Sequence, residues 1–128
     1  MSGGAPFSVE LEGTQFEAGG TLRGNAVFDS MIEELEGAGG VRLEVTMKVL
    51  GSGNPETTKI FDQTIYTGAV HAPLRCPFEV PLPANGPCTF DGRHVKITWH
   101  ARVTVDVAWA FDPKATIGFA VVPRSVTS

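Results

Sequence analysis

The chain has 128 residues, of which 42% are hydrophobic, and it carries a formal net charge of −4 at pH 7. This length suits one domain with one core, and the apolar fraction is too high for a disordered chain. An acidic chain of this kind lacks the basic stripe of nucleic-acid-binding proteins, so we expect no nucleic-acid partner. We also expect no membrane insertion, because no run approaches the roughly 18 uncharged apolar residues of a membrane helix.

The first six residues have no basic region followed by an apolar region, so they do not resemble a secretory signal. The cytosol is therefore the expected compartment, and Cys76 and Cys88 are expected to be reduced thiols. A disulfide between these two cysteines stays open as an alternative. We expect a single domain over residues 1–128, with frayed ends at residues 1–5 and 124–128.

Apolar and polar residues alternate along the chain, which predicts β-strands with one buried face. The apolar positions of the first strands are Phe7, Val9 and Leu11, then Leu22, Gly24, Ala26 and Phe28, then Val41, Leu43, Val45, Met47 and Val49. A weaker strand signal contains Ile60, Phe61, Ile65 and Tyr66, and a clear one contains Phe78, Val80 and Leu82. These patterns predict five strands between residues 7 and 82.

The longest alternating run covers residues 94–111, and a last strand is predicted at "ATIGFAVVP", residues 115–123. The long run has one apolar parity, made of Val95, Ile97, Trp99, Ala101, Val103, Val105, Val107 and Trp109. It exceeds the usual strand length, so we expect it to bend or to carry a bulge midway.

The segment "DSMIEELEGAGG", residues 29–40, breaks the alternation. Ser30 lies three residues before Glu33, as in a capping box, and Met31, Ile32 and Leu35 follow at helical spacing. We interpret this segment as one short helical turn between two strands. Its apolar side chains either cover one end of the fold or present a patch to a partner protein.

A proline-rich bend, "PFEVPLPANGPCTFDG" at residues 77–92, separates two of the alternating runs. Proline has no N–H group and a fixed φ, so we expect its four prolines to bracket a short strand and force its exit. About eight strands joined by Gly/Pro turns predict an all-β, antiparallel, immunoglobulin-like β-sandwich.

Two stretches resemble landmarks of the arrestin fold. "FEAGGTLRGNAVFD", residues 16–29, is similar to the early strand pair of that family, with an aromatic residue, a glycine turn and a spaced glycine at Gly24. The bend is similar to a second landmark, with its "LP" step and with Phe90 and Gly92 before the long strand. The resemblance spans residues 7–123 and departs from the family at Cys88-Thr89 and Trp99.

The family includes arrestins, the arrestin-like subunit of retromer and bacterial sporulation-control proteins, most of which have two sandwiches. The resemblance therefore implies a single-domain arrestin-like β-sandwich that is not an enzyme and serves as a scaffold or adaptor. The polar core between two sandwiches, which senses phosphate in the family, is not expected in a single sandwich.

The sequence contains no recognisable catalytic or metal-binding motif, so we predict no cofactor and no metal. His94 and His100 would lie about 20 Å apart on an extended strand, and Cys76, Cys88 and His94 lack zinc-site spacing. The loop "GSGNPETTK", residues 51–59, lacks the ending of a phosphate-binding loop and predicts a hairpin. A small enzyme with a site assembled from Cys88, His94 and an acid stays open.

We expect the domain to bind an unidentified protein, for example by adding a partner's strand to an open sheet edge. A homodimer formed through an edge strand is equally compatible with the sequence. The contacts are expected at loops 30–40 and 51–59, with Met31, Ile32, Leu35, Asn54, Glu56 and Lys59 as the candidate residues. The alternative is a carbohydrate-binding or adhesive module, which would need exposed aromatic residues such as Trp109 and Phe111.

Overall fold

A computed structural model describes residues 7–29, 38–51, 53–71, 73–85, 87–107 and 113–123. These residues form nine strands, namely β1 (Ser8–Leu11), β2 (Gln15–Glu17), β3 (Thr21–Phe28), β4 (Ala38–Leu50), β5 (Glu56–Thr67), β6 (Leu74–Pro81), β7 (Phe90–Asp91), β8 (Lys96–Val107) and β9 (Lys114–Val122). The described residues contain no helix. The predicted helical turn with Met31, Ile32 and Leu35, and the aromatic residues Trp109 and Phe111, lie outside the described residues.

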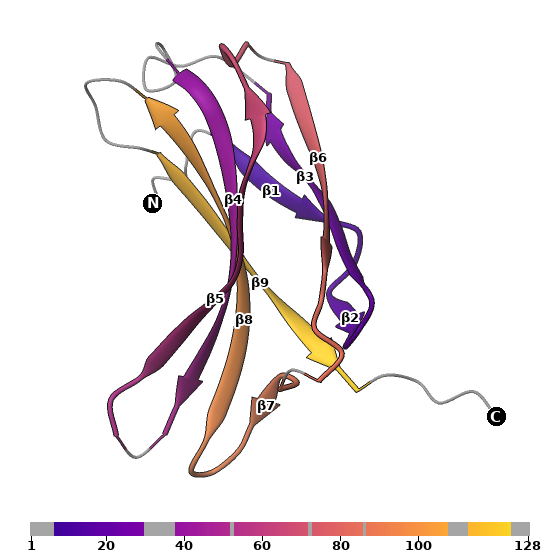
Figure 1. Cartoon of the computed structure of the whole chain (residues 1–128), viewed down its shortest axis with the longest axis vertical. Coiled ribbons are helices and arrows are strands. Elements are labelled where there is room, and N and C mark those ends of the chain that lie inside the picture. The colour runs from indigo at the N-terminus through magenta and orange to yellow at the C-terminus, as the bar shows by residue number, and fades with distance from the viewer. Residues whose placement is uncertain are drawn as a thin grey trace, which may run out of the picture.

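The strands form the two layers of a β-sandwich, as predicted (Figure 1). The smaller sheet has the order β1-β3-β6, and the larger sheet has the order β2-β9-β8-β4-β5 with β7 attached to β8. The pairs are antiparallel with one exception, because β2 pairs in parallel with β9. The predicted antiparallel β-sandwich is confirmed, with this one parallel pair at an edge of the larger sheet.

The core lies between the two sheets and contains apolar side chains at the positions that the alternation predicts to face inward. The fully buried large side chains are Leu22, Val27, Phe28, Val41, Leu43, Val45, Val70, Val80, Trp99, Val103 and Val105. Each buried Val, Leu or Phe of this kind stabilises a fold by about 1.5–3 kcal/mol. Val95 is an exception to the predicted parity, because its side chain is 40% exposed.

The predicted bulge in the long strand is wrong over Lys96–Asp106, because β8 pairs there with β4 one residue for one. The bulges lie in β5 instead, where Ile60 and Ile65 are extra residues opposite β4. A further shift leaves Gly39 as an extra residue of β4 opposite β8. An extra residue in β8 would disturb pairing on both sides, whereas an edge strand such as β5 tolerates it.

The proline-rich bend begins inside a strand rather than before one. Pro77 and Pro81 belong to β6, so the expectation that these prolines bracket a short strand is corrected. The Leu82 N–H donates to the Gly20 carbonyl at 2.9 Å. The backbone N–H and C=O groups of the even-numbered residues of β6 therefore point toward β3. Both prolines occupy odd positions, where the missing N–H would have pointed away from the sheet.

Candidate functional site

The larger sheet ends at β5, and the free edge of this strand is irregular. Two extra residues, Ile60 and Ile65, interrupt its pairing with β4. Bulges and charged side chains are common means of preventing unwanted strand pairing at an edge. The edge of β5 is therefore poorly suited to a partner's strand that would pair along the whole of β5.

The free edge of β6 in the smaller sheet is blocked by proline. The residues of β6 whose backbone faces away from β3 are Arg75, Pro77, Glu79 and Pro81. Two of these four positions have no N–H to donate, so a regular ladder cannot form there. This is the structural consequence of the proline-rich bend.

Over its first half, the free edge of β9 has neither a bulge nor a proline. The Val105 N–H donates to the Pro113 carbonyl at 2.9 Å, which sets the alternation between β8 and β9. The backbone groups of Lys114, Thr116 and Gly118 therefore face away from β8. Among the described residues, β2 covers this edge of β9 only from Ala120 onward.

A hollow of about 370 Å³ lies beside this open edge of β9. One wall is formed by Phe7, Ser8 and Val9 at β1, and the other by residues 114–117 of β9. The two walls belong to different sheets, because β1 pairs with β3 and makes no ladder with β9. An extended peptide at the edge would thus have backbone partners on β9 and apolar side chains beside it. We call the edge at Lys114, Thr116 and Gly118, together with this hollow, the β9 edge site.

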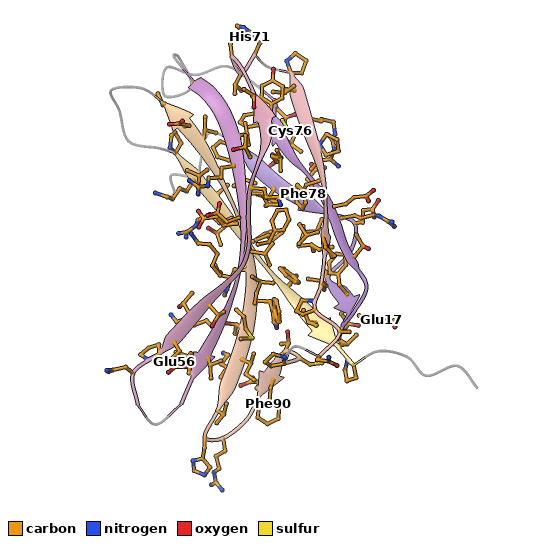
Figure 2. All side chains as sticks on the ribbon, viewed as in Figure 1. Glu17, Glu56, His71, Cys76, Phe78 and Phe90 are labelled. Atoms are coloured by element: carbon orange, nitrogen blue, oxygen red, sulfur yellow. The ribbon has the colours of Figure 1, made fainter. Side chains whose placement is uncertain are left out.

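The predicted contact loop lies at the opposite, lower end of the sandwich in Figure 2. Asn54 and Glu56 are both exposed, and the neighbouring hairpin between β7 and β8 adds Phe90 and Val95. Phe90 is 53% exposed, and these two are the exposed large hydrophobic residues of the described part of the chain. The structure therefore places two predicted contact residues at the same end of the sandwich as two exposed apolar side chains that the sequence did not indicate.

Lys59, the third predicted residue of this loop, lies within β5 and is held by two acids. Its Nζ is 3.3 Å from Glu44 Oε2 and 3.1 Å from Asp62 Oδ2, and Arg42 makes a bidentate pair with the same Asp62 at 2.5 and 2.7 Å. The hydrogen bond from Arg42 and that from Lys59 lower the pKa of Asp62. The hydrogen bonds to Asp62 and Glu44 raise the pKa of Lys59. These pairs are at the surface, so they hold Lys59 in place without stabilising the fold strongly.

The cysteines and histidines form no catalytic or metal-binding centre in the part of the chain that the structure describes. Cys76 is buried in the core, where burial raises the pKa of its thiol, and both cysteines are free. No hydrogen bond joins Cys88 to His94 there, and no group of three His, Cys, Asp or Glu residues is placed to hold a metal ion. Trp99 is buried and donates from Nε1 to the Pro87 carbonyl at 3.2 Å, so it offers no stacking face to a sugar.

The fold defines the chain as an arrestin-like β-sandwich, and comparison with known proteins agrees. The model of the arrestin (or S-antigen) N-terminal domain matches residues 73–126. A solved structure of Spo0M, a sporulation control protein from Bacillus subtilis, is similar at a TM-score of 0.66 and 14% sequence identity. The similarity covers 98% of this chain and 51% of the Spo0M chain, so this chain spans about half the length of that protein.

No curated protein matches the chain in sequence. The two similarities nevertheless support the arrestin-like family that the residues 16–29 and 77–92 predicted. The identity to Spo0M is 14%, so the structural similarity shows the fold of the chain. The described residues contain no helix long and apolar enough to span a membrane.

Proposed function

We propose that this domain is a cytosolic, non-catalytic adaptor that binds a partner protein by accepting one of its strands at the β9 edge site. The observation that carries the proposal is the backbone of Lys114, Thr116 and Gly118, which no described strand pairs, beside a hollow lined by both polar and apolar residues. The blocked edge of β6 and the bulged edge of β5 favour this position. The free cysteines are consistent with a reducing compartment.

The second part of the proposal concerns the lower end of the sandwich. Asn54 and Glu56, with Phe90 between exposed polar residues, offer a further contact that would add specificity to the strand addition. Met31, Ile32 and Leu35 remain predicted contact residues outside the described part of the chain. Lys59 contributes through its ion pairs rather than as a free cation.

A proline placed at an edge-facing position tests the strand addition directly. Thr116→Pro removes the edge N–H of β9 without removing a hydrogen bond to β8. The matched control is Glu79→Pro, which removes an edge-facing N–H of β6 in the same way. Partners are captured from the native cell with the tagged wild-type chain and with each variant.

We expect one partner to be captured by the wild type and by Glu79→Pro but not by Thr116→Pro. In the purified complex, hydrogen exchange should slow at the amides of Lys114, Thr116 and Gly118. A partner retained by Thr116→Pro would show that the β9 edge is not the site. A partner lost only with Phe90→Ser would place the contact at the lower end of the sandwich instead.

A further inference from the structure

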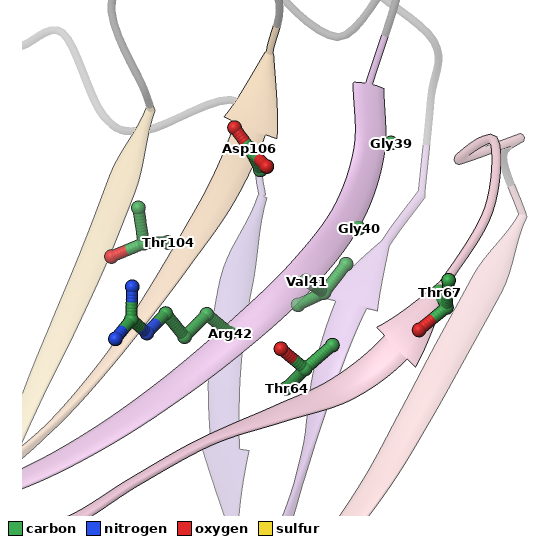
Figure 3. Close-up of a pocket in the computed structure, with 8 residues that line it drawn as sticks. All are labelled: Gly39, Gly40, Val41, Arg42, Thr64, Thr67, Thr104 and Asp106. Atoms are coloured by element: carbon green, nitrogen blue, oxygen red, sulfur yellow. The ribbon is translucent and has the colours of Figure 1, made fainter.

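The outer face of the larger sheet has a polar hollow of about 350 Å³ near the start of β4 (Figure 3). It lies on a different surface from the β9 edge site. Its lining comes from three adjacent strands and consists of Gly39, Gly40, Val41, Arg42, Thr64, Thr67, Thr104 and Asp106. A volume of this size suits a small ligand.

Two glycines open this hollow in an otherwise continuous sheet. Gly40 pairs with Asp106 on β8 and with Thr67 on β5, so its missing side chain leaves a gap between an acid and a hydroxyl. Gly39 is the extra residue of the β4 bulge, and a Cβ atom built there would meet no atom within 4 Å. The gap is therefore a property of the glycine pair and the bulge.

Opposite charges lie at the two sides of the hollow. Arg42 pairs with Thr104 and Gly40 pairs with Asp106, so Arg42 and Asp106 are diagonal neighbours on adjacent strands. Asp62 accepts from Nε and Nη2 of Arg42, which fixes the guanidinium and leaves the Nη1 hydrogens available. The charge of Asp106 contributes, after the stronger effect of Asp62, to raising the pKa of Arg42.

The hydroxyl between these charges has no partner. Thr104 is 8% exposed, and its Oγ1 makes no hydrogen bond with any described residue. The carboxylate of Asp106 likewise has no hydrogen-bond or ion-pair partner in the described part of the chain. Asp106 is exposed, so its carboxylate is available to a polar molecule in the hollow, whereas Thr104 Oγ1 is buried beneath the surface of the hollow.

We propose that this hollow binds a small zwitterion, such as a free amino acid, with its ammonium group against Asp106 and its carboxylate against Arg42. An anion alone would face the carboxylate of Asp106, and a cation alone would leave the Nη1 hydrogens of Arg42 without an acceptor. A molecule with both charges satisfies the two sides at once.

The probes are three amino acids of increasing charge separation, namely glycine, β-alanine and γ-aminobutyrate. Each is titrated into the full chain, and binding is followed by the amide resonances of Gly39, Gly40, Thr104 and Asp106. We expect saturable shifts at these amides, with one chain length bound more tightly than the other two. Acetate and methylammonium are titrated separately as probes with one charge each.

The variant Asp106→Asn should weaken binding of the preferred probe by about tenfold or more, because it removes a charge-assisted hydrogen bond. The matched control, Asp91→Asn, makes the same change at the exposed end of β7 and should leave the affinity unchanged. Gly39→Val should abolish binding by filling the hollow. Because its Cβ meets open space, resonances away from the hollow should remain in place.

Three results would overturn the proposal. The first is the absence of saturable shifts up to about 10 mM of every amino acid. The second is an equal affinity in Asp106→Asn and Asp91→Asn. The third is binding of acetate or methylammonium as tight as that of the amino acids. If Gly39→Val did not fold, the comparison of the two aspartate variants would still decide, because both change exposed side chains. None of these results depends on the β9 edge site.

Discussion

The larger sheet has one half that the smaller sheet covers and one half that extends beyond it (Figure 1). In the covered half, Val45 on β4 and Ala101 on β8 are opposite one another and fully buried. Four residues further along, the equivalent pair of Val49 and Ile97 is only half-buried. The strands and their inward parity are the same in both halves. Burial therefore depends on where the second sheet ends.

The largest effect is expected from the same substitution made in both halves of β4. Val45→Ala should lower the free energy of unfolding by about 2–3 kcal/mol, because it leaves a cavity between packed sheets. Val49→Ala should cost less than about 1 kcal/mol, since its surroundings are already open to water. Equilibrium unfolding in urea measures both values. Equal losses would mean that the two halves are packed alike.

A somewhat smaller effect is expected at Gly24, where the covered side of the smaller sheet has no spare room. A Cβ atom there would overlap the Glu10 carbonyl oxygen and lie 2.9 Å from the ring of Phe78. Gly24→Ala should therefore cost about 1–3 kcal/mol through overpacking. Gly118→Ala is the control, because its Cβ would meet other atoms only at 3.6 Å or more. A loss at Gly118 as large as that at Gly24 would contradict the steric explanation.

The sequence predicted the sandwich well because alternation and Gly/Pro turns are local signals. It placed Gly24 at a special position through family resemblance, and the crowding around that residue gives the physical reason. It could not predict that Val95 is exposed, since parity gives the face of a strand and not the extent of the opposite sheet. The position of the bulges was missed for a related reason. They depend on which strands are at the edge, and strand order is not a local property.

The candidate sites were less predictable than the fold. Asn54 and Glu56 were identified because a Gly-rich hairpin is a recognisable exposed loop. Thr116 and Gly118 give no signal in the sequence, because an open edge exists only once β2 and β8 have taken their places beside β9. The hollow around Gly40 likewise requires three strands in register. The glycine pair at 39–40 was the one local indication of it.

A small effect on stability is expected in the extended half. Phe90 and Val95 are exposed, so Phe90→Ser and Val95→Thr should each change the free energy of unfolding by less than about 0.5 kcal/mol. The same measurement in urea applies, with unchanged circular dichroism as the control for folding. A loss comparable to that of Val45→Ala would show that this end is covered by another part of the molecule. Such a result would also argue against its use as a contact for a partner protein.

The smallest effect on stability is expected on the outer face of the larger sheet, where ion pairs rather than buried apolar side chains are changed. The pKa of Asp62 is lowered in the folded protein by its hydrogen bonds with Arg42 and Lys59. A carboxyl group with a lower pKa in the folded state stabilises the fold while it is ionised. Its contribution is fully present above the ordinary pKa of the group and is lost as the pH falls through the lowered value.

Asp62→Asn should therefore reduce stability slightly at neutral pH and flatten the loss of stability in acid. The difference should shrink at high salt, since the pair is exposed to solvent. Urea unfolding of the variant and the wild type across the acid range tests this, with Asp91→Asn as the control at a carboxylate that makes no ion pair with any described residue. A variant whose acid sensitivity matched that of the wild type would show that the cluster on β4 and β5 holds side chains in position without contributing to the pH dependence of the fold.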